Sequence, residues 1–258
     1  MKSLGRWLMW LLLAGVALQL FFVLRIALLL VLDPHSTAFM RSEAWRLASQ
    51  SLVGTENWRW SHQWVDAEQI SPNLKRAVIA SEDAGFIEHA GVDWEAIEAA
   101  WEKNEHRQQL AEQRAERLQR QQARNPSASA APQRPVRIIG GSTITQQLAK
   151  NLLLSGERTL LRKGQELVLA LALETLLSKD RILELYLNSV EWGEGVFGAE
   201  AAAQRYFRKS AHQLSAHEAA RLAVMLPRPK FFETRQNSAF LARRAATIVA
   251  RMGDVSLP

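Results

Sequence analysis

The segment from Trp7 to Leu32 constrains the chain more than any other feature. Only Gly15, Gln19 and Arg25 among its 26 residues are not apolar. About 20 apolar residues are enough to span a bilayer, whereas the apolar region of a signal peptide has about 7–15. No cleavage site of small residues follows the segment. We therefore predict an uncleaved transmembrane helix over residues 7–32.

The flanks of this segment predict its orientation. Two basic residues precede it, and Trp7 and Trp10 lie at its entrance. Positive charge favours the cytoplasmic side, and tryptophan favours the membrane interface. We expect residues 1–6 to be cytoplasmic and the chain beyond Asp33 to lie outside the cytoplasm.

Composition narrows the chemistry. The 258 residues include no cysteine, which excludes a disulfide scaffold, a cysteine-ligated metal and cysteine catalysis. The net charge of +6 suits nucleic acid, an anionic membrane or an acidic substrate. Because the domain is expected beyond the membrane, we predict no nucleic-acid partner. Membrane lipid and a lipid-linked phosphate are the expected partners.

Helix signals follow one another along the rest of the chain, so we predict a mainly α fold. Residues 33–70 form a juxtamembrane segment whose tryptophans are expected to divide between the lipid interface and the domain. We expect the main domain over residues 71–253 and a short tail over residues 254–258. Capping patterns predict helix starts at Ser71-Pro72, Asp93, Thr143 with Gln146, Ser178, and Ser215 with Glu218. A core helix is expected over Leu161–Leu177, a last helix over Ala239–Met252, and a strand only over Arg137–Ile139.

The segment from Glu102 to Pro135 differs in kind from its surroundings. It carries seven basic and four acidic residues, a net charge of +3, and ends in NPSASAAPQRP. Apolar residues are too sparse for a coiled coil. We expect a solvated helix that passes into a flexible linker. The alternative is a mobile flap that touches anionic lipid or substrate.

Three segments carry candidate chemistry. The first, Ala77–Trp94, ends an apolar helix in Ser81-Glu82-Asp83. The second, Ile138–Asn151, joins a Gly-Gly turn to a helix N-terminus, which suits a phosphate or carboxylate. The third, Arg162–Glu174, places charged side chains three and four residues apart on one helix face. Taken singly, each segment is ordinary helix capping or ion pairing.

In this order the segments resemble the glycosyltransferase family 51 domain of bacterial cell-wall synthesis. The likeness runs from about residue 70 to 226, and no penicillin-binding half follows, so we expect the monofunctional form. The first motif corresponds to Glu82, Asp83, Phe86, His89 and Gly91, the second to Gly140 through Asn151, and the third to Arg162, Lys163 and Glu166.

The resemblance implies a lysozyme-like glycosyltransferase domain behind one N-terminal transmembrane helix. It implies polymerisation of lipid II into β-1,4-linked glycan strands at the bacterial inner membrane, with the catalytic domain in the periplasm. The implied partners are lipid II, the growing glycan strand, and other cell-wall synthesis and division proteins. The implied substrate-binding residues are Asp83, Phe86, His89, Ser142, Thr143, Gln146, Gln147, Lys150, Asn151, Arg162 and Lys163.

Chemical reasoning on the same residues agrees with these roles. A polyprenyl diphosphate leaves, so cations such as Lys150, Arg162 and Lys163 must stabilise the developing negative charge. The attacking hydroxyl must lose a proton, which one carboxylate can take as general base. The resemblance assigns that role to Glu82 and makes Glu166 the second carboxylate. Direct attack inverts the anomeric centre. A divalent cation, Mg²⁺ or Mn²⁺, bridging Glu166 to the diphosphate is implied by the resemblance alone, and no metal site is assigned.

Two alternatives remain open at this point. One is a lytic enzyme that cuts finished glycan, which would need a carboxylic acid of raised pKa but no cationic cluster. The other is a non-catalytic, membrane-tethered scaffold of the wall-synthesis complex. The sequence also departs from the family's pattern, because the 102–135 insert lengthens the connection between the first two motifs. Ala84 and Gly85 stand where relatives often have longer polar side chains.

Overall fold

A computed structural model describes residues 2–54, 59–124, 141–154 and 159–258. The chain forms two compact units, Met1–Val92 with Thr143–Pro258, and Asp93–Ser142, and each is described by itself. The helices are α1 (Lys2–Leu28), α2 (Ala38–Val53), α3 (Pro72–Glu82), α4 (Trp94–Arg124), α5 (Ile144–Leu153), α6 (Leu160–Leu176), α7 (Lys179–Ser189), α8 (Ala199–Phe207), α9 (Ala216–Met225), α10 (Pro229–Glu233) and α11 (Ala239–Arg251). Single turns of 3₁₀ helix cover Ala67–Gln69, Ala211–Gln213 and Met252–Asp254.

The predicted helix starts are confirmed. Ser71 caps α3 and is followed by Pro72 at the first helical position. Thr143 and Ser215 begin α5 and α9 with capping boxes that satisfy backbone donors of the first turn. Ser178 caps α7 in the same way. The mainly α fold class therefore follows from local capping signals that the structure uses.

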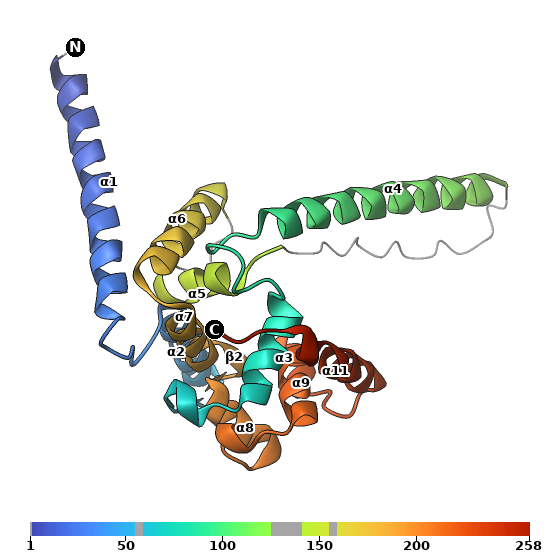
Figure 1. The fold of residues 1–258 in the computed structure, drawn as a ribbon. Coiled ribbons are helices and arrows are strands. Elements are labelled where there is room, and N and C mark those ends of the chain that lie inside the picture. Colours follow the sequence, from blue (N-terminus) through green and yellow to red (C-terminus); the bar gives the residue numbers. More distant parts are fainter. Residues whose placement is uncertain (1, 55–58, 125–140, 155–158) are drawn as a thin grey trace. The chain divides into compact units, whose positions relative to one another are not determined.

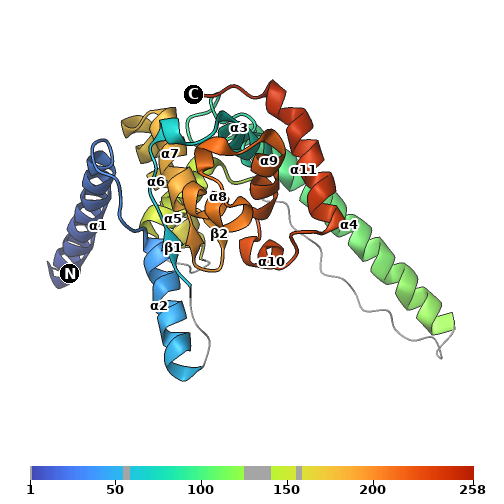
Figure 2. The same cartoon turned by 90° about the horizontal axis from the view of Figure 1, so that it is seen from below.

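The core of the larger unit lies between two groups of helices. Helices α3, α9 and α11 pack together in one group, as both views show (Figure 1, Figure 2). Helix α5 packs against α2, α6 and α7 in the other. The largest fully buried side chains include Trp192, Tyr186 and Phe86.

The larger unit also contains a small three-stranded sheet, which was not predicted. Its strands are β1 (Ser61–His62), β3 (Val196–Phe197) and β2 (Glu191–Gly193), in that order. β1 runs parallel to β3, and β2 runs antiparallel to it. Strands of two or three residues are too short to show an alternating pattern. The expected strand over Arg137–Ile139 lies outside the described residues.

Gly195, between β2 and β3, has a φ of +69°, and a Cβ there would collide with the carbonyl oxygen of Arg59. The close approach of the two backbones therefore requires glycine.

Helix α1 is the one described helix that is long and apolar enough to cross a membrane, over Ser3–Leu28 with a mean hydropathy of 2.3. The helix ends at Leu28, although apolar residues continue to Leu32. The C-terminal half of α1 packs against the rest of the larger unit, where Phe22 and Ile26, with Leu29 just beyond the helix end, belong to the core.

The expectation of a core helix over Leu161–Leu177 was half wrong. Leu169, Ala170 and Leu173 of α6 are buried, but Val168 and Leu171 are 49% and 46% exposed. Residues 167–173 are all apolar, so the sequence could not show that only one face of this part of α6 packs against protein. Among the juxtamembrane tryptophans, Trp64 packs against the core as expected, whereas Trp45 is 78% exposed, and its contact with lipid stays a prediction. Trp58 lies outside the described residues.

The unit Asp93–Ser142 consists mainly of α4. The Asp93 carboxylate accepts a hydrogen bond from the Ala96 amide at 2.8 Å, which confirms the predicted cap. Most side chains of α4 beyond Ala100 are exposed, as expected for a solvated helix. The expected linker, from residue 125 onward, lies outside the described residues.

Candidate active site

Glu82, the last residue of α3, is held by neutral hydrogen-bond donors. The Gln147 amide donates to one of its carboxylate oxygens at 3.0 Å, and the Ser81 hydroxyl donates to the other at 3.4 Å. Burial raises the pKa of Glu82, the nearby charge of Asp83 adds to that, and the two hydrogen bonds and the positive charge of Arg244 oppose it. A carboxylate of raised pKa is suited to take a proton.

Tyr186 fixes the orientation of Gln147 and was missed by sequence reasoning. Its buried hydroxyl donates to the Gln147 side-chain oxygen at 3.1 Å. The Gln147 NH₂ group therefore turns toward Glu82. Burial, with the charges of Glu82 and Asp83, raises the pKa of Tyr186 well above its ordinary value, so the hydroxyl remains a donor. Tyr186 lies in the matched stretch KDRILELYLN, but its apolar neighbours gave no reason to single it out.

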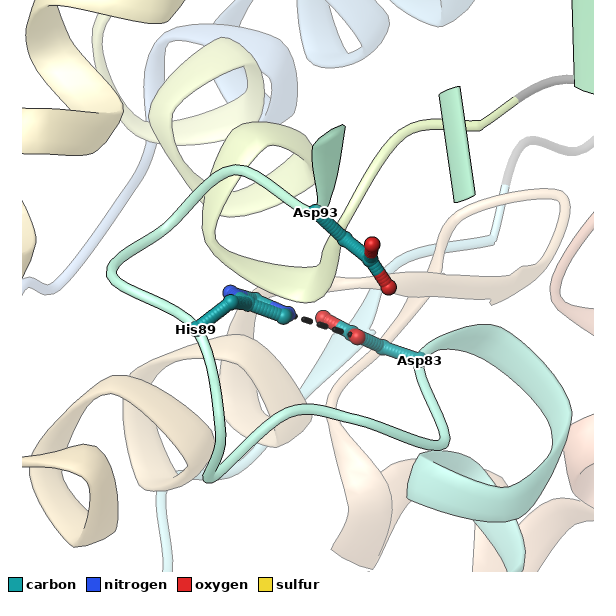
Figure 3. Close-up of side chains that lie close together, drawn as sticks. All are labelled: Asp83, His89 and Asp93. Carbon is teal, nitrogen blue, oxygen red and sulfur yellow. Dashed lines mark hydrogen bonds and ion pairs between the residues drawn. The ribbon is translucent and has the colours of Figure 1, made fainter. Parts of the chain in front are cut away.

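Asp83 ties the first motif to the second. One of its carboxylate oxygens accepts from the Ile144 amide, in the first turn of α5, at 2.9 Å. The other lies 2.8 Å from Nε2 of His89 (Figure 3). The Gly91 amide donates to His89 Nδ1 at 3.1 Å, so Nε2 carries the proton that is shared with Asp83. Asp93, drawn in the same view, begins the other unit, where it caps α4.

The loop after α3 is fastened to α6 and α7. Gly91 has a φ of +84°, and a Cβ there would lie 2.8 Å from Cγ of Glu174. The Lys179 ammonium donates to the Glu174 carboxylate at 2.8 Å and to the His89 carbonyl at 2.6 Å. Thr145 donates to the same Glu174 oxygen. Glu174 therefore holds the loop in place.

Glu166 lies in a different electrostatic environment. It is only 3% exposed, and the Arg162 guanidinium and the Lys163 ammonium contact its two oxygens at 2.9 and 2.5 Å. The predicted spacing on one helix face is confirmed. Because both oxygens of Glu166 already contact a cationic side chain, this donor set does not fit a resident divalent ion.

Direct contacts join the first two motifs, and the third reaches them through the packing of α6 on α5. Several residues expected to bind substrate are held within the protein. Phe86 is fully buried, and Asn151 is 8% exposed. The Gln146 side-chain oxygen accepts from the Thr143 amide in the capping box. Lys150 lies in the last turn of α5, Ser142 lies at the end of the other unit, and Gly140 lies outside the described residues.

The family model and the similar proteins that match this chain are all described as transglycosylases. A family model described as transglycosylase matches residues 49–137 and 127–253. A biosynthetic peptidoglycan transglycosylase of Burkholderia thailandensis is 50% identical over 246 residues, which cover 95% of this chain and 84% of the relative. Proteins of the same description from Burkholderia pseudomallei and Burkholderia vietnamiensis are each 49% identical over 245 residues, covering 95% of this chain and 84% and 87% of the relatives. The chain belongs to the transglycosylase family.

Proposed function

We propose that the chain is a peptidoglycan glycosyltransferase that polymerises lipid II into β-1,4-linked glycan strands and releases polyprenyl diphosphate. One observation carries the mechanism. The site holds two carboxylates in opposite environments, Glu82 among neutral donors and Glu166 between two cations. These environments suit a base at one residue and a charge-paired anchor at the other.

Glu82 acts as general base. The acceptor sugar's hydroxyl attacks the anomeric carbon of the donor, and its proton passes to the Glu82 carboxylate. Tyr186 donates to Gln147 and Gln147 donates to Glu82, and these two hydrogen bonds keep the carboxylate oriented. Asp83 and His89 are positioning residues, because they fasten α5 and the loop after α3.

Cations stabilise the leaving group. As the bond between the anomeric carbon and oxygen breaks, negative charge develops on the diphosphate, and Lys150, Arg162 and Lys163 compensate it. Glu166 keeps Arg162 and Lys163 in defined positions before the substrate arrives. The bond to the acceptor forms on the face opposite to the diphosphate, so the product is inverted and no glycosyl-enzyme intermediate is required.

Membrane attachment fits this substrate, whose prenyl chain remains in the bilayer. Helix α1 fits a single-pass membrane anchor. The proposed location is the bacterial inner membrane, with the N-terminus in the cytoplasm and the catalytic domain in the periplasm. Lys2 and Arg6 before the apolar run support this orientation.

The two rival functions make different demands on the site. A lytic enzyme needs a protonated acid and no diphosphate cluster, whereas this chain pairs two cations with Glu166. A scaffold has no need for a partly buried carboxylate of raised pKa. Glycan synthesis is the function that uses both the raised pKa of Glu82 and the two cations paired with Glu166.

Purified full-length protein in liposomes, supplied with lipid II, tests the proposal. The parent is expected to form glycan strands. Glu82→Gln is expected to lose at least about 100-fold in rate, the scale of a general base. Glu88→Gln is the matched control, because Glu88 is an exposed carboxylate in the same loop. Unimpaired polymerisation by Glu82→Gln would remove Glu82 from the mechanism. A parent that is inert on lipid II but cuts finished glycan would overturn the proposed function.

A further inference from the structure

Helix α1 carries one side-chain amide, that of Gln19, and it is hydrogen-bonded to the side chain of Gln165 on α6. The Gln19 NH₂ group donates to the Gln165 side-chain oxygen at 2.9 Å, and the Gln165 NH₂ group donates back to the Gln19 oxygen at 3.1 Å. An unpaired amide in hydrocarbon is costly, because lipid offers no hydrogen-bond partner. The reciprocal pair therefore joins α1 to α6 where separation would leave two polar groups unsatisfied.

Gln19 belongs to a stripe along one face of α1. Phe22 and Ile26 continue it at spacings of three and four residues, which place them above one another on a helix, and Leu29 extends it in the turn just after the helix end. They are 9%, 0% and 9% exposed, whereas the adjacent Leu20 is 63% exposed. The packed stripe fixes the rotation of α1 about its own axis relative to the larger unit.

A second tie holds the end of α1. The Arg181 guanidinium, on α7, donates to the backbone carbonyls of Leu29 and Leu32 at 2.9 and 3.2 Å and to the Asp33 carboxylate at 2.7 Å. Gln19 and Leu29 are ten residues apart, about 15 Å along a helix. Two ties at this separation oppose both sliding and tilting of α1 against the domain.

With α1 across the membrane, the ties would set the depth of the third motif. Gln19 lies nine residues before the end of α1, about 14 Å inside it. Gln165 meets it there, so this part of α6 lies at the level of the apolar layer. The exposed Val168 and Leu171 of α6 then have lipid to contact rather than water.

Gln165 also immediately precedes Glu166, whose carboxylate binds Arg162 and Lys163. The backbone of α6 therefore links the amide pair directly to the cations that are assigned to the diphosphate.

We propose that Gln19 and Gln165 are positioning residues: their amide pair, with the Arg181 tie, fixes the height of the Arg162–Lys163–Glu166 cluster against the bilayer. The cluster then meets the diphosphate of a lipid-anchored substrate at a set level. The proposal rests on the proposed function and on α1 crossing the membrane. In this proposal α1 is a part of the substrate site. If α1 only attached the domain to the membrane, the hydrogen-bonded pair of Gln19 and Gln165 would not be required.

The first test separates binding from chemistry in the full-length protein, reconstituted in liposomes with lipid II. Gln19→Leu and Gln165→Leu each leave one amide unpaired. We expect each to raise KM by about 3- to 18-fold, the range measured for hydrogen bonds between membrane helices, and to change kcat by less than about twofold. The double variant is expected to be no worse than either single one, because it leaves no amide stranded.

Two further variants keep this test specific. Gln19→Glu preserves an acceptor for Gln165 and, when protonated in the apolar layer, a donor as well, so it should restore a near-parental KM. Leu20→Ala changes a lipid-facing neighbour and should leave KM unchanged. Unaltered KM in both leucine variants would overturn the positioning role. So would an equal loss in Gln19→Glu.

The second test measures depth without activity. Because the chain has no cysteine, a single Val168→Cys takes one nitroxide label, and Gln213→Cys, exposed next to α8, serves as the aqueous control. In phosphatidylglycerol and phosphatidylethanolamine vesicles, the label at 168 should collide with oxygen and be shielded from a water-soluble nickel complex. The label at 213 should show the reverse.

Equal exposure of both labels to nickel would overturn the depth assignment. A parent that is inert on lipid II would refute the proposed function, while the label at 168 would still decide whether α6 lies in the bilayer.

Discussion

Glu82 and Glu166 are the two carboxylates of the proposed site, yet the fold surrounds them in opposite ways. Glu82 accepts hydrogen bonds from Gln147 and Ser81, and burial raises its pKa. Glu166 is more completely buried but binds two cations at its two oxygens. Burial therefore does not decide what a carboxylate does, because the charge of its partners does. A proton acceptor and a cation holder can be made from the same residue type.

The largest effect is expected where Glu166 loses its partners. Arg162→Met with Lys163→Met removes two cations from the leaving group, and the rate on lipid II should fall by at least about 100-fold. Lys209→Met, which breaks a salt bridge to Glu218 of 2.8 Å elsewhere in the unit, is the matched control and should change the rate by less than about twofold. A small loss in the double variant would mean that these cations do not contact the diphosphate.

A smaller effect tests the neutral side of the comparison. Tyr186→Phe removes the hydroxyl that orients Gln147, and the rate should fall by about 2- to 12-fold, as for one hydrogen bond. The chain's other tyrosine provides the control, since the Tyr206 hydroxyl donates to the Trp192 carbonyl at 2.8 Å and not to the site. If Tyr186→Phe and Tyr206→Phe lose the same fraction of the rate, the effect of Tyr186→Phe reflects a general loss of stability and not the orientation of Gln147.

The smallest effect is one of stability and pH. Because the pKa of Glu82 is raised in the folded state, the folded protein binds more protons than the unfolded chain between the ordinary pKa of 4.5 and the raised one. The stability contributed by Glu82 is therefore greatest at low pH and decreases as the pH rises through this window, by at most about 1.4 kcal/mol per pH unit.

Glu82→Gln removes the free-energy cost of holding a charged carboxylate in this buried place. The unfolding midpoint of the variant in detergent should therefore exceed that of the parent increasingly from pH 4.5 upward. Glu88→Gln should follow the parent at every pH. A midpoint difference that is independent of pH would show that Glu82 is not strained in its charged form.

Much of the fold could be predicted, because helix starts depend on short-range chemistry. Ser71, Thr143, Ser178 and Ser215 each cap the helix that their sequence context predicts. The pairing of Glu166 with Arg162 followed from helix geometry in the same way. The small sheet could not be predicted, because β2 and β3 are too short to show an alternating pattern and β1 pairs with a segment more than 100 residues away, Ser61 with Val196.

Other features of the site were hidden for a related reason. Tyr186 lies between two leucines of α7, and only the tertiary packing places its hydroxyl on Gln147. Apolar residues on every side of α1 likewise concealed which face packs, because a helix that is apolar all round gives no hydrophobic direction, and the apolar run over residues 167–173 of α6 had the same effect. The partner of Gln19 lies 146 residues away in the chain.

The packed stripe of α1 also has a consequence for the order of folding. Phe22, Ile26 and Leu29 are among the first residues to be synthesised, yet α6 and α7 follow about 140 residues later, some 7 to 30 seconds at ordinary translation rates. The first helix must therefore wait in the bilayer until the rest of its own core arrives. Chains shortened to begin after Asp33 would fold with that part of the core uncovered, and aggregation of such chains would come from a missing piece of the domain rather than from a missing tether.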